Sequence, residues 1–365
     1  ANGSSMILNP SNTPFSIWLA EGQSSQREML LAMQAMKCQY NLPMTIVASH
    51  RQPRPEILNC ADIAYQEPSE PSERVEFVLE QAKHHHVKVV LTGRNSQDYE
   101  VRRQDFKAAG IRLLTGATDT ATLELMDDKA AFTAFCQQHD IPVASGWQFD
   151  NTDELMALLA LHGEQPLCVK PVKGIFAQGF WRLDTAAVDA WDSFEHLYFT
   201  EDKKIHLAQF LHAYNHSQMV TDKPIAMLLM PYLAGKEYSI DVVCETGEVL
   251  AAVTRYKEGS EQHVGYDEAV MQLVKRLVTA LKADGIVSIQ TKADENGMHK
   301  VLEINSRASG GIGYTDHAFD NGTMNLTQLA FAYWSGCITK PQLAAVRDTI
   351  TPCIVRPLMT SVKIG

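Results

Sequence analysis

The first third of the chain alternates short apolar runs with amphipathic stretches, and this pattern constrains the fold more than any other feature. The expected strands cover residues 15–20, 44–48, 62–65, 87–92 and 111–114. Helical patterns between them cover residues 26–37, 72–86 and 99–109, and Ser72 is expected to cap the second helix. Strands that alternate with helices predict a parallel, doubly wound sheet. We therefore expect an α/β fold for this part of the chain.

Sheets of this kind bind ligands beyond the carboxyl ends of their strands. Four residues lie just after expected strands, namely Gly22, Gly93, Arg94 and Asn95. Two interpretations are equally supported at this point. These residues line a ligand crevice, or they are turn residues only.

The rest of the chain favours an α+β arrangement. The expected helices cover residues 129–139, 153–162, 267–283 and 325–335, with Asp127 and Asp128 as cap candidates for the first. The expected strands cover residues 167–170, 180–183, 226–230, 237–244, 249–256, 286–292 and 300–305. The last two should form a hairpin around Asn296-Gly297, because this dipeptide favours tight turns.

Charge and composition exclude several classes of partner. The 365-residue chain has a formal net charge of −11, which argues against a general nucleic-acid binder because such proteins present a basic face. No apolar run reaches the roughly 20 residues that span a bilayer, and no signal-peptide pattern is present. We therefore expect a cytoplasmic protein without nucleic-acid or membrane partners. The seven cysteines form no C-x-x-C pair and fit reduced thiols.

The sharpest chemical pattern lies in the two strands of the expected hairpin. Glu303 and Asn305 are two residues apart, so their side chains leave the same face of their strand. The hairpin can bring Gln290 beside them, and three oxygen ligands on one sheet face suit Mg²⁺. Leu302 and Ile304 should point to the opposite, buried face. The alternative interpretation is an exposed polar strand face.

Two arginines are candidates for binding anionic groups. Arg307 follows the hairpin and could clamp a phosphate or an acyl phosphate through two parallel hydrogen bonds. The residues after it, Ser309, Gly310 and Gly311, would allow a backbone to approach a ligand closely, although a plain glycine-rich turn has the same composition. Arg255 ends an earlier strand and could equally bind a substrate carboxylate or lie on the surface.

Lysines and glycines in the middle of the chain suggest polyphosphate contacts. Lys170 ends an expected strand, and the loop after it runs through Lys173 and Gly174 to Gly179. Such a loop can form a nest of N–H groups over phosphates while the lysine supplies a point charge, but ordinary hairpins contain the same residue types. Lys129 stands in the first turn of a helix, where a cation is unfavourable unless an anion is near.

Residues 230–237 read Met-Pro-Tyr-Leu-Ala-Gly-Lys-Glu and run from an apolar strand into a hinge. Such a hinge can offer backbone N–H and C=O groups to the edge of an adenine ring between apolar walls. Glu237 could then accept hydrogen bonds from ribose hydroxyls. An ordinary turn between two strands is the alternative.

In order and spacing, these features resemble the ATP-grasp superfamily over about residues 115–325. The matching series is Lys129, Lys170, the 174–179 loop, Glu237, Gln290, Glu303-x-Asn305 and Arg307. Gln290 with the Glu-x-Asn-x-Arg pattern is similar to the carbamoyl-phosphate-synthetase branch. The whole chain also resembles stand-alone ATP-grasp proteins associated with tellurite-resistance-type gene clusters.

The resemblance implies a domain order. A tail or expression remnant would cover residues 1–13, a Rossmann-like pre-ATP-grasp domain residues 14–115, and a two-lobed ATP-grasp domain residues 116–365. Within the last, a small ATP-binding lobe would cover about 127–230 and a core lobe about 231–335.

The resemblance also implies ATP and Mg²⁺, or Mn²⁺ in its place, as cofactors. The residues implied to bind ATP are Lys129, Lys170, Lys173, Gly174, Gly179, Met230, Tyr232, Leu233 and Glu237. Those implied to bind the metal are Gln290, Glu303 and Asn305. The 174–179 loop departs from the family pattern because it is poor in glycine, and Phe176 within it could act as a lid.

The implied reaction activates a small carboxylic acid with ATP and joins it to an amine, with release of ADP and phosphate. The implied catalytic residues are Arg307, Arg255 and Lys170. An ATP-grasp kinase and a non-catalytic nucleotide-binding regulator are the alternatives. The sequence names neither substrate, and it does not fix the oligomeric state, although homodimers are common in such folds.

Overall fold

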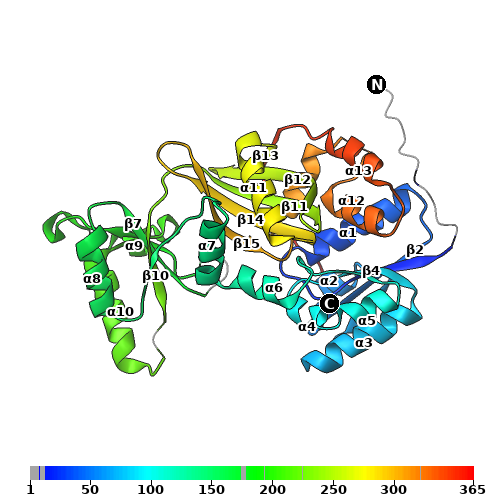
Figure 1. The fold of residues 1–365 in the computed structure, drawn as a ribbon, viewed down its shortest axis with the longest axis horizontal. Coiled ribbons are helices and arrows are strands. Elements are labelled where there is room, and N and C mark those ends of the chain that lie inside the picture. The colour runs from blue at the N-terminus through cyan, green and yellow to red at the C-terminus, as the bar shows by residue number, and fades with distance from the viewer. Residues whose placement is uncertain (1–7, 9–12, 174–177, 193, 224, 321) are drawn as a thin grey trace. The chain divides into compact units, whose positions relative to one another are not determined.

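The computed structural model describes residues 8, 13–173, 178–192, 194–223, 225–320 and 322–365 (Figure 1). The chain forms two compact units. The larger unit comprises Ala1–Met126, Lys236–Lys292 and Val301–Gly365, and the smaller unit comprises Asp127–Gly235 and Ala293–Lys300. None of the helices in the described ranges is long and apolar enough to cross a membrane.

A five-stranded parallel sheet forms the first half of the larger unit. In the order β3-β2-β1-β4-β5, it contains β1 Phe15–Leu19, β2 Met44–His50, β3 Ile63–Gln66, β4 Val87–Leu91 and β5 Arg112–Leu114. Every residue of β1 is buried, as expected for a central strand covered on both faces. Ile17 and Leu19 pack into one apolar cluster and Trp18 and Ala20 into another. The predicted parallel α/β sheet is confirmed.

The helices of this half are α1 Gln26–Gln39, α2 Pro55–Leu58, α3 Pro71–His84, α4 Ser96–Glu100, α5 Arg103–Ala108 and α6 Thr120–Asp127. Two predictions about them were wrong. The side chain of Glu70, not of Ser72, caps α3, because Pro71 occupies the first helical position. The single helix expected over 99–109 is divided, since the backbone at Arg102 leaves helical geometry at φ −105° and ψ 17°.

A six-stranded sheet forms the second half of the larger unit. In the order β15-β14-β11-β12-β13-β16, it contains β11 Glu237–Glu245, β12 Glu248–Glu258, β13 Glu261–Gly265, β14 Gly285–Ala293, β15 His299–Asn305 and β16 Cys353–Val355. Its helices are α11 Glu268–Leu281, α12 Leu326–Trp334 and α13 Lys340–Arg347, and η3 Ile312–Ala318 is a short 3₁₀-helix. One apolar cluster contains Ile17 and Met33 from the first half and Val253 and Phe331 from the second, so both halves share a core.

The smaller unit is built on a five-stranded sheet. In the order β6-β10-β7-β8-β9, it contains β6 Trp147–Phe149, β7 Leu167–Pro171, β8 Trp181–Asp184, β9 Lys204–His206 and β10 Met227–Pro231. Its helices are α7 Lys129–Gln138, α8 Thr152–His162, α9 Glu195–Tyr198 and α10 Leu207–Val220. Phe149, Leu155 and Leu229 belong to its apolar core. Asp128 caps α7 by accepting a hydrogen bond of 3.0 Å from the backbone N–H of Ala131.

Candidate functional site

The three predicted metal ligands lie on neighbouring strands. Gln290 belongs to β14, and Glu303 and Asn305 belong to β15, the strand next to it in the sheet. All three side chains are half-buried. Three oxygen donors with one formal negative charge fit Mg²⁺, which fills its remaining positions with water or phosphate oxygens. In the described part of the chain no group of three or more His, Cys, Asp or Glu residues could hold a metal, so binding here needs both amide oxygens.

The burial of β15 differs from the predicted two-faced pattern. Ile304 is buried as predicted, but Leu302 is only half-buried and Val301 is fully buried. Val301 shares its face with Glu303, because side chains two residues apart point the same way. Each face of β15 is therefore covered at one point only, and the predicted division into a polar and a buried face holds only in part.

Arg307 lines a pocket within the larger unit. Gly22, which follows β1, and Gly93, which follows β4, line the same pocket. The two loops touch so closely that a Cβ atom on Gly93 would lie 2.6 Å from the Cα atom of Gly22. The structure thus brings Gly22, Gly93 and Arg307 to one place, at the carboxyl edge of the parallel sheet. Arg94 and Asn95, also predicted for this crevice, are not among the residues that line the pocket.

Arg255 is a half-buried member of a hydrogen-bonded network on β12. Its Nη1 donates to Gln262 Oε1 at 3.0 Å, and its Nη2 donates to Ser309 Oγ at 3.1 Å. Its guanidinium carbon lies 5.6 Å from the ring centre of Tyr314 in η3, within the range of a cation–π contact. Its Nε is buried and has no hydrogen-bond partner among the described residues. The two bonds from Nη1 and Nη2 use only part of the five N–H donors of the guanidinium.

A buried carboxylate holds the loop that Arg255 touches. Asp241 is 0% exposed and accepts hydrogen bonds from the N–H and the hydroxyl of Ser309, at 2.8 and 2.7 Å. Burial raises the pKa of Asp241, while the charge of Arg255 and the bonds from Ser309 oppose that rise. A Cβ atom on Gly311 would lie 2.5 Å from the guanidinium carbon of Arg255, so the loop needs glycine there. The 309–311 loop is therefore fixed from both sides.

The lysines predicted to contact phosphates lie in the smaller unit. Lys129 is the first residue of α7, and Lys170 is half-buried in β7, paired with Leu228 of β10. Lys173 and Gly179 are exposed. The predicted contact Gly174 and the predicted lid Phe176 lie outside the described residues.

The predicted adenine hinge follows β10. Met230 is buried, with 5% of its surface exposed, and suits an apolar wall. The backbone N–H of Tyr232 donates to the carbonyl of Pro166 at 2.8 Å, so this N–H is already engaged. Glu237, the predicted ribose ligand, is exposed at the start of β11.

Comparisons with known proteins agree with this architecture. Residues 223–357 match the family model described as "ATP-grasp in the biosynthetic pathway with Ter operon". No curated protein sequence matches the chain. Among solved structures, N5-carboxyaminoimidazole synthetase of Staphylococcus aureus with ADP has a TM-score of 0.63 at 13% identity, over 90% of this chain and 79% of that one.

Two further structures are similar at comparable identity. The L-amino acid ligase of Bacillus licheniformis has a TM-score of 0.60 at 14% identity, over 92% of this chain and 78% of that one. A third structure is the biotin carboxylase domain of Hydrogenobacter thermophilus 2-oxoglutarate carboxylase with MgADP, ADP and bicarbonate. It has a TM-score of 0.57 at 16% identity, over 88% of this chain and 69% of that one. The chain thus has the fold of these structures, and its residues 223–357 match an ATP-grasp family model.

Sequence reasoning missed part of the polar edge of the parallel sheet. Glu21, His50 and Arg51 interact at this edge, but only Gly22, Gly93, Arg94 and Asn95 had been singled out. The available signal was the position of each residue at the end of an expected parallel strand. His263 belongs to β13 and stacks on Tyr256 with ring centres 4.8 Å apart.

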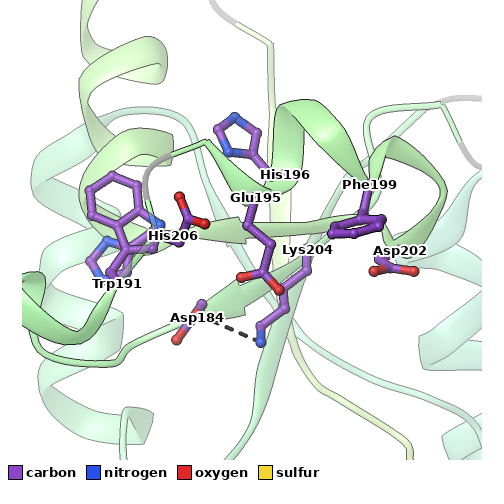
Figure 2. Close-up of a pocket in the computed structure, with 9 residues that line it drawn as sticks. Asp184, Trp191, Glu195, His196, Phe199, Asp202, Lys204 and His206 are labelled. Carbon is purple, nitrogen blue, oxygen red and sulfur yellow. Dashed lines mark ion pairs between the residues drawn. The ribbon is translucent and has the colours of Figure 1, made fainter.

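A second pocket lies within the smaller unit (Figure 2). Its lining is formed by Asp184, Trp191, Asp192, Glu195, His196, Phe199, Asp202, Lys204 and His206. Figure 2 shows Trp191 against His206, and their ring centres are 4.1 Å apart. Lys204 and Asp184 form an ion pair of 3.6 Å at this pocket. Among the described residues, none of those predicted to bind ATP or metal contributes to this lining.

Proposed function

We propose that this chain is an ATP-dependent ligase of the ATP-grasp type that activates a small carboxylic acid and joins it to an amine, with release of ADP and phosphate. The observation that carries the proposal is the pocket lined by Arg307 and by the loops at the carboxyl edge of the parallel sheet. An arginine directly after a half-buried Glu-x-Asn strand is placed to meet a phosphate close to a metal site. Similar structures that hold ADP or MgADP, and one that is an L-amino acid ligase, support nucleotide-dependent ligation.

The proposed chemistry has two steps. A carboxylate oxygen of the acid attacks the γ-phosphorus of ATP, the bond from that phosphorus to the β–γ bridging oxygen breaks, and ADP leaves. The amine nitrogen then attacks the acyl carbon and loses a proton, and phosphate departs with the electron pair of the C–O bond. Arg307 would donate to the phosphoryl oxygens in both steps, where negative charge is spread over them. Arg255 would hold the acid with a guanidinium that Gln262 and Ser309 already orient.

The nucleotide roles follow the family pattern residue by residue. We assign the phosphates to Lys129, Lys170, Lys173, Gly174 and Gly179, the adenine to Met230, Tyr232 and Leu233, and the ribose to Glu237. Gln290, Glu303 and Asn305 would hold Mg²⁺, or Mn²⁺ in its place. When bound, the metal would supply positive charge that offsets the charge of the phosphates.

The test is an ADP-release assay with ATP, Mg²⁺, an amine and a panel of amino acids and small carboxylic acids. We expect ADP, phosphate and a condensed product in equal amounts with at least one acid. Glu303→Ala should abolish turnover, whereas Glu295→Ala, which changes an exposed carboxylate in the turn between β14 and β15, should not. A stable phosphorylated acid or alcohol would instead identify a kinase. Nucleotide binding without turnover on any acid would identify a regulator.

A further inference from the structure

Charged side chains gather where the central strands of the parallel sheet end. Glu21 follows β1, His50 ends β2, Arg51 comes next, and Arg94 follows β4. Arg51 Nε donates to Glu21 Oε2 at 2.6 Å, and His50 Nε2 lies 3.5 Å from Glu21 Oε1. The side chain of Glu21 is only 3% exposed, so its carboxylate is a buried anchor that orients both neighbours.

The guanidinium groups around this cluster differ in whether they have a carboxylate partner, and the carboxylates of Glu67 and Asp98 also act on Arg51. Arg51 is paired with Glu21, and Arg54 has a carboxylate partner of its own. The exposed guanidinium of Arg94 has no hydrogen bond or ion pair with any residue that the structure describes. Burial lowers the pKa of His50, Glu21 raises it, and the charges of Arg54, Arg51 and Arg94 lower it further. All three guanidinium groups are thus close enough to act on one imidazole.

The cluster borders the pocket that contains Arg307. The backbone N–H of Arg94 donates to the carbonyl of Glu21 at 3.0 Å, which ties the loop after β4 to the loop after β1. The next residue on each loop, Gly22 and Gly93, lines the pocket. Arg94 is not itself among the residues that line the pocket, but it is adjacent in sequence to Gly93, which is. Glu21 would not repel an anion strongly, because Arg51 already neutralises it.

We propose that the acid substrate carries a second anionic group, a carboxylate or a phosphate, and that Arg94 binds it with support from Arg51 and His50. A guanidinium fork matches the paired oxygens of either group. The inference rests on the proposed function, because it names the substrate class for the same pocket. Arg307 would serve the carboxylate that is activated, and Arg94 the anionic group that is only recognised.

Direct binding tests the anion site without any reaction. Succinate and butyrate are matched probes that differ by one carboxylate, and calorimetry with the full chain would measure both without ATP. We expect succinate to bind about 10-fold tighter than butyrate, and Arg94→Gln to remove the difference. Arg102→Gln is the matched control, because this arginine already pairs with Glu76 and Asp105 in the same unit. Equal affinity for the two probes, or equal losses in both variants, would overturn the site.

Measurements of turnover distinguish a failure of this inference from a failure of the proposed ligase function. ADP release would be compared for L-glutamate against L-glutamine and for O-phospho-L-serine against L-serine, which also distinguishes a carboxylate from a phosphate. Arg94→Gln should raise the KM for the doubly anionic acid about 10- to 100-fold and leave kcat unchanged. ADP formed equally from both members of each pair, unaffected by Arg94→Gln, would overturn the anion site and leave the ligase. Succinate binding that depends on Arg94 without ADP from any acid would overturn the ligase and leave the anion site.

Discussion

In the larger unit the predicted binding side chains are fixed by other half-buried or buried side chains, whereas in the smaller unit several predicted nucleotide contacts stand on exposed segments. Arg255 is held by Gln262 and Ser309, and Asp241 holds Ser309 in turn. Lys173 and Gly179, by contrast, are exposed at the two ends of the phosphate loop. The proposed reaction thus combines a side chain held by hydrogen bonds, Arg255, with exposed residues, Lys173 and Gly179.

The contrast has a physical reason in the proposed reaction. Groups that orient a transferring phosphoryl group must be held to within a fraction of an ångström, and buried hydrogen-bond networks do this. A loop that closes over a nucleotide must also open to release ADP, and segments with few buried contacts open at low free-energy cost. Substitutions in the two units should therefore change different properties: kcat or the free energy of unfolding in the larger unit, and the KM for ATP in the smaller unit.

The largest effect is expected for Arg307→Ala. Loss of a donor that meets charge in the transition state should lower kcat about 100- to 1,000-fold while the KM for ATP changes little. Steady-state ADP release would measure both constants. Arg356→Ala, at an arginine whose side chain is 65% exposed, is the control that should retain kcat. If Arg307→Ala kept its kcat, Arg307 would have no part in the chemistry.

Asp241→Ala should be the most destabilising of these changes. It leaves the N–H and hydroxyl of Ser309 and the charge of Arg255 without their buried partner, so the free energy of unfolding should fall by about 3 kcal/mol. Urea unfolding monitored by circular dichroism would measure the loss. Asp320→Ala, at an exposed carboxylate, should change it little. A near-neutral Asp241→Ala would show that the network does not hold the larger unit.

Lys170→Met should act on the nucleotide and not on the fold. Removing one charge from a phosphate contact should raise the KM for ATP about 10-fold. The free energy of unfolding should stay the same, because methionine keeps the length of the half-buried stem. Lys223→Met in the same unit is the exposed control. If Lys170→Met lowered the free energy of unfolding as much as Asp241→Ala, the proposed difference between the units would be wrong.

The smallest effect is expected for Asp128→Ala. The change removes the side-chain acceptor that caps α7, which should cost the smaller unit about 1 kcal/mol. Amide hydrogen exchange would report faster opening in the first turn of α7, and exchange in the parallel sheet should be unchanged. Asp153→Ala, near the start of α8 where Asn151 is the cap, should leave α7 as it is. Faster exchange in both units would mean that they open together.

Local sequence patterns predicted most of the fold. The strands of the parallel sheet were predicted because runs of four to six residues alternate with helical periodicity. Asp128 was predicted as a cap because its side chain can accept from the first free N–H groups of a helix. The short strands β13 and β16 were missed, because three to five residues do not establish a period of two.

The site was predictable only where neighbours in sequence are neighbours in space. Glu303, Asn305 and Arg307 follow from the geometry of one strand. Glu21 and Arg51 form a pair although they are 30 positions apart in sequence, and no local pattern predicts this contact. Such contacts depend on which strands lie side by side, and this order was not evident from a single sequence.

The contact between Gly93 and Gly22 limits how the pocket can be remodelled. No side chain fits between the two loops, since even a methyl group on Gly93 would collide with the main chain of Gly22. At this contact the pocket wall consists of peptide groups, and a substitution of Gly93 cannot reshape it without moving the main chain. A change of preferred acid would instead come from side chains that line the pocket elsewhere, such as Gln23, Met29 and Arg307, so a directed-evolution library should begin with those codons.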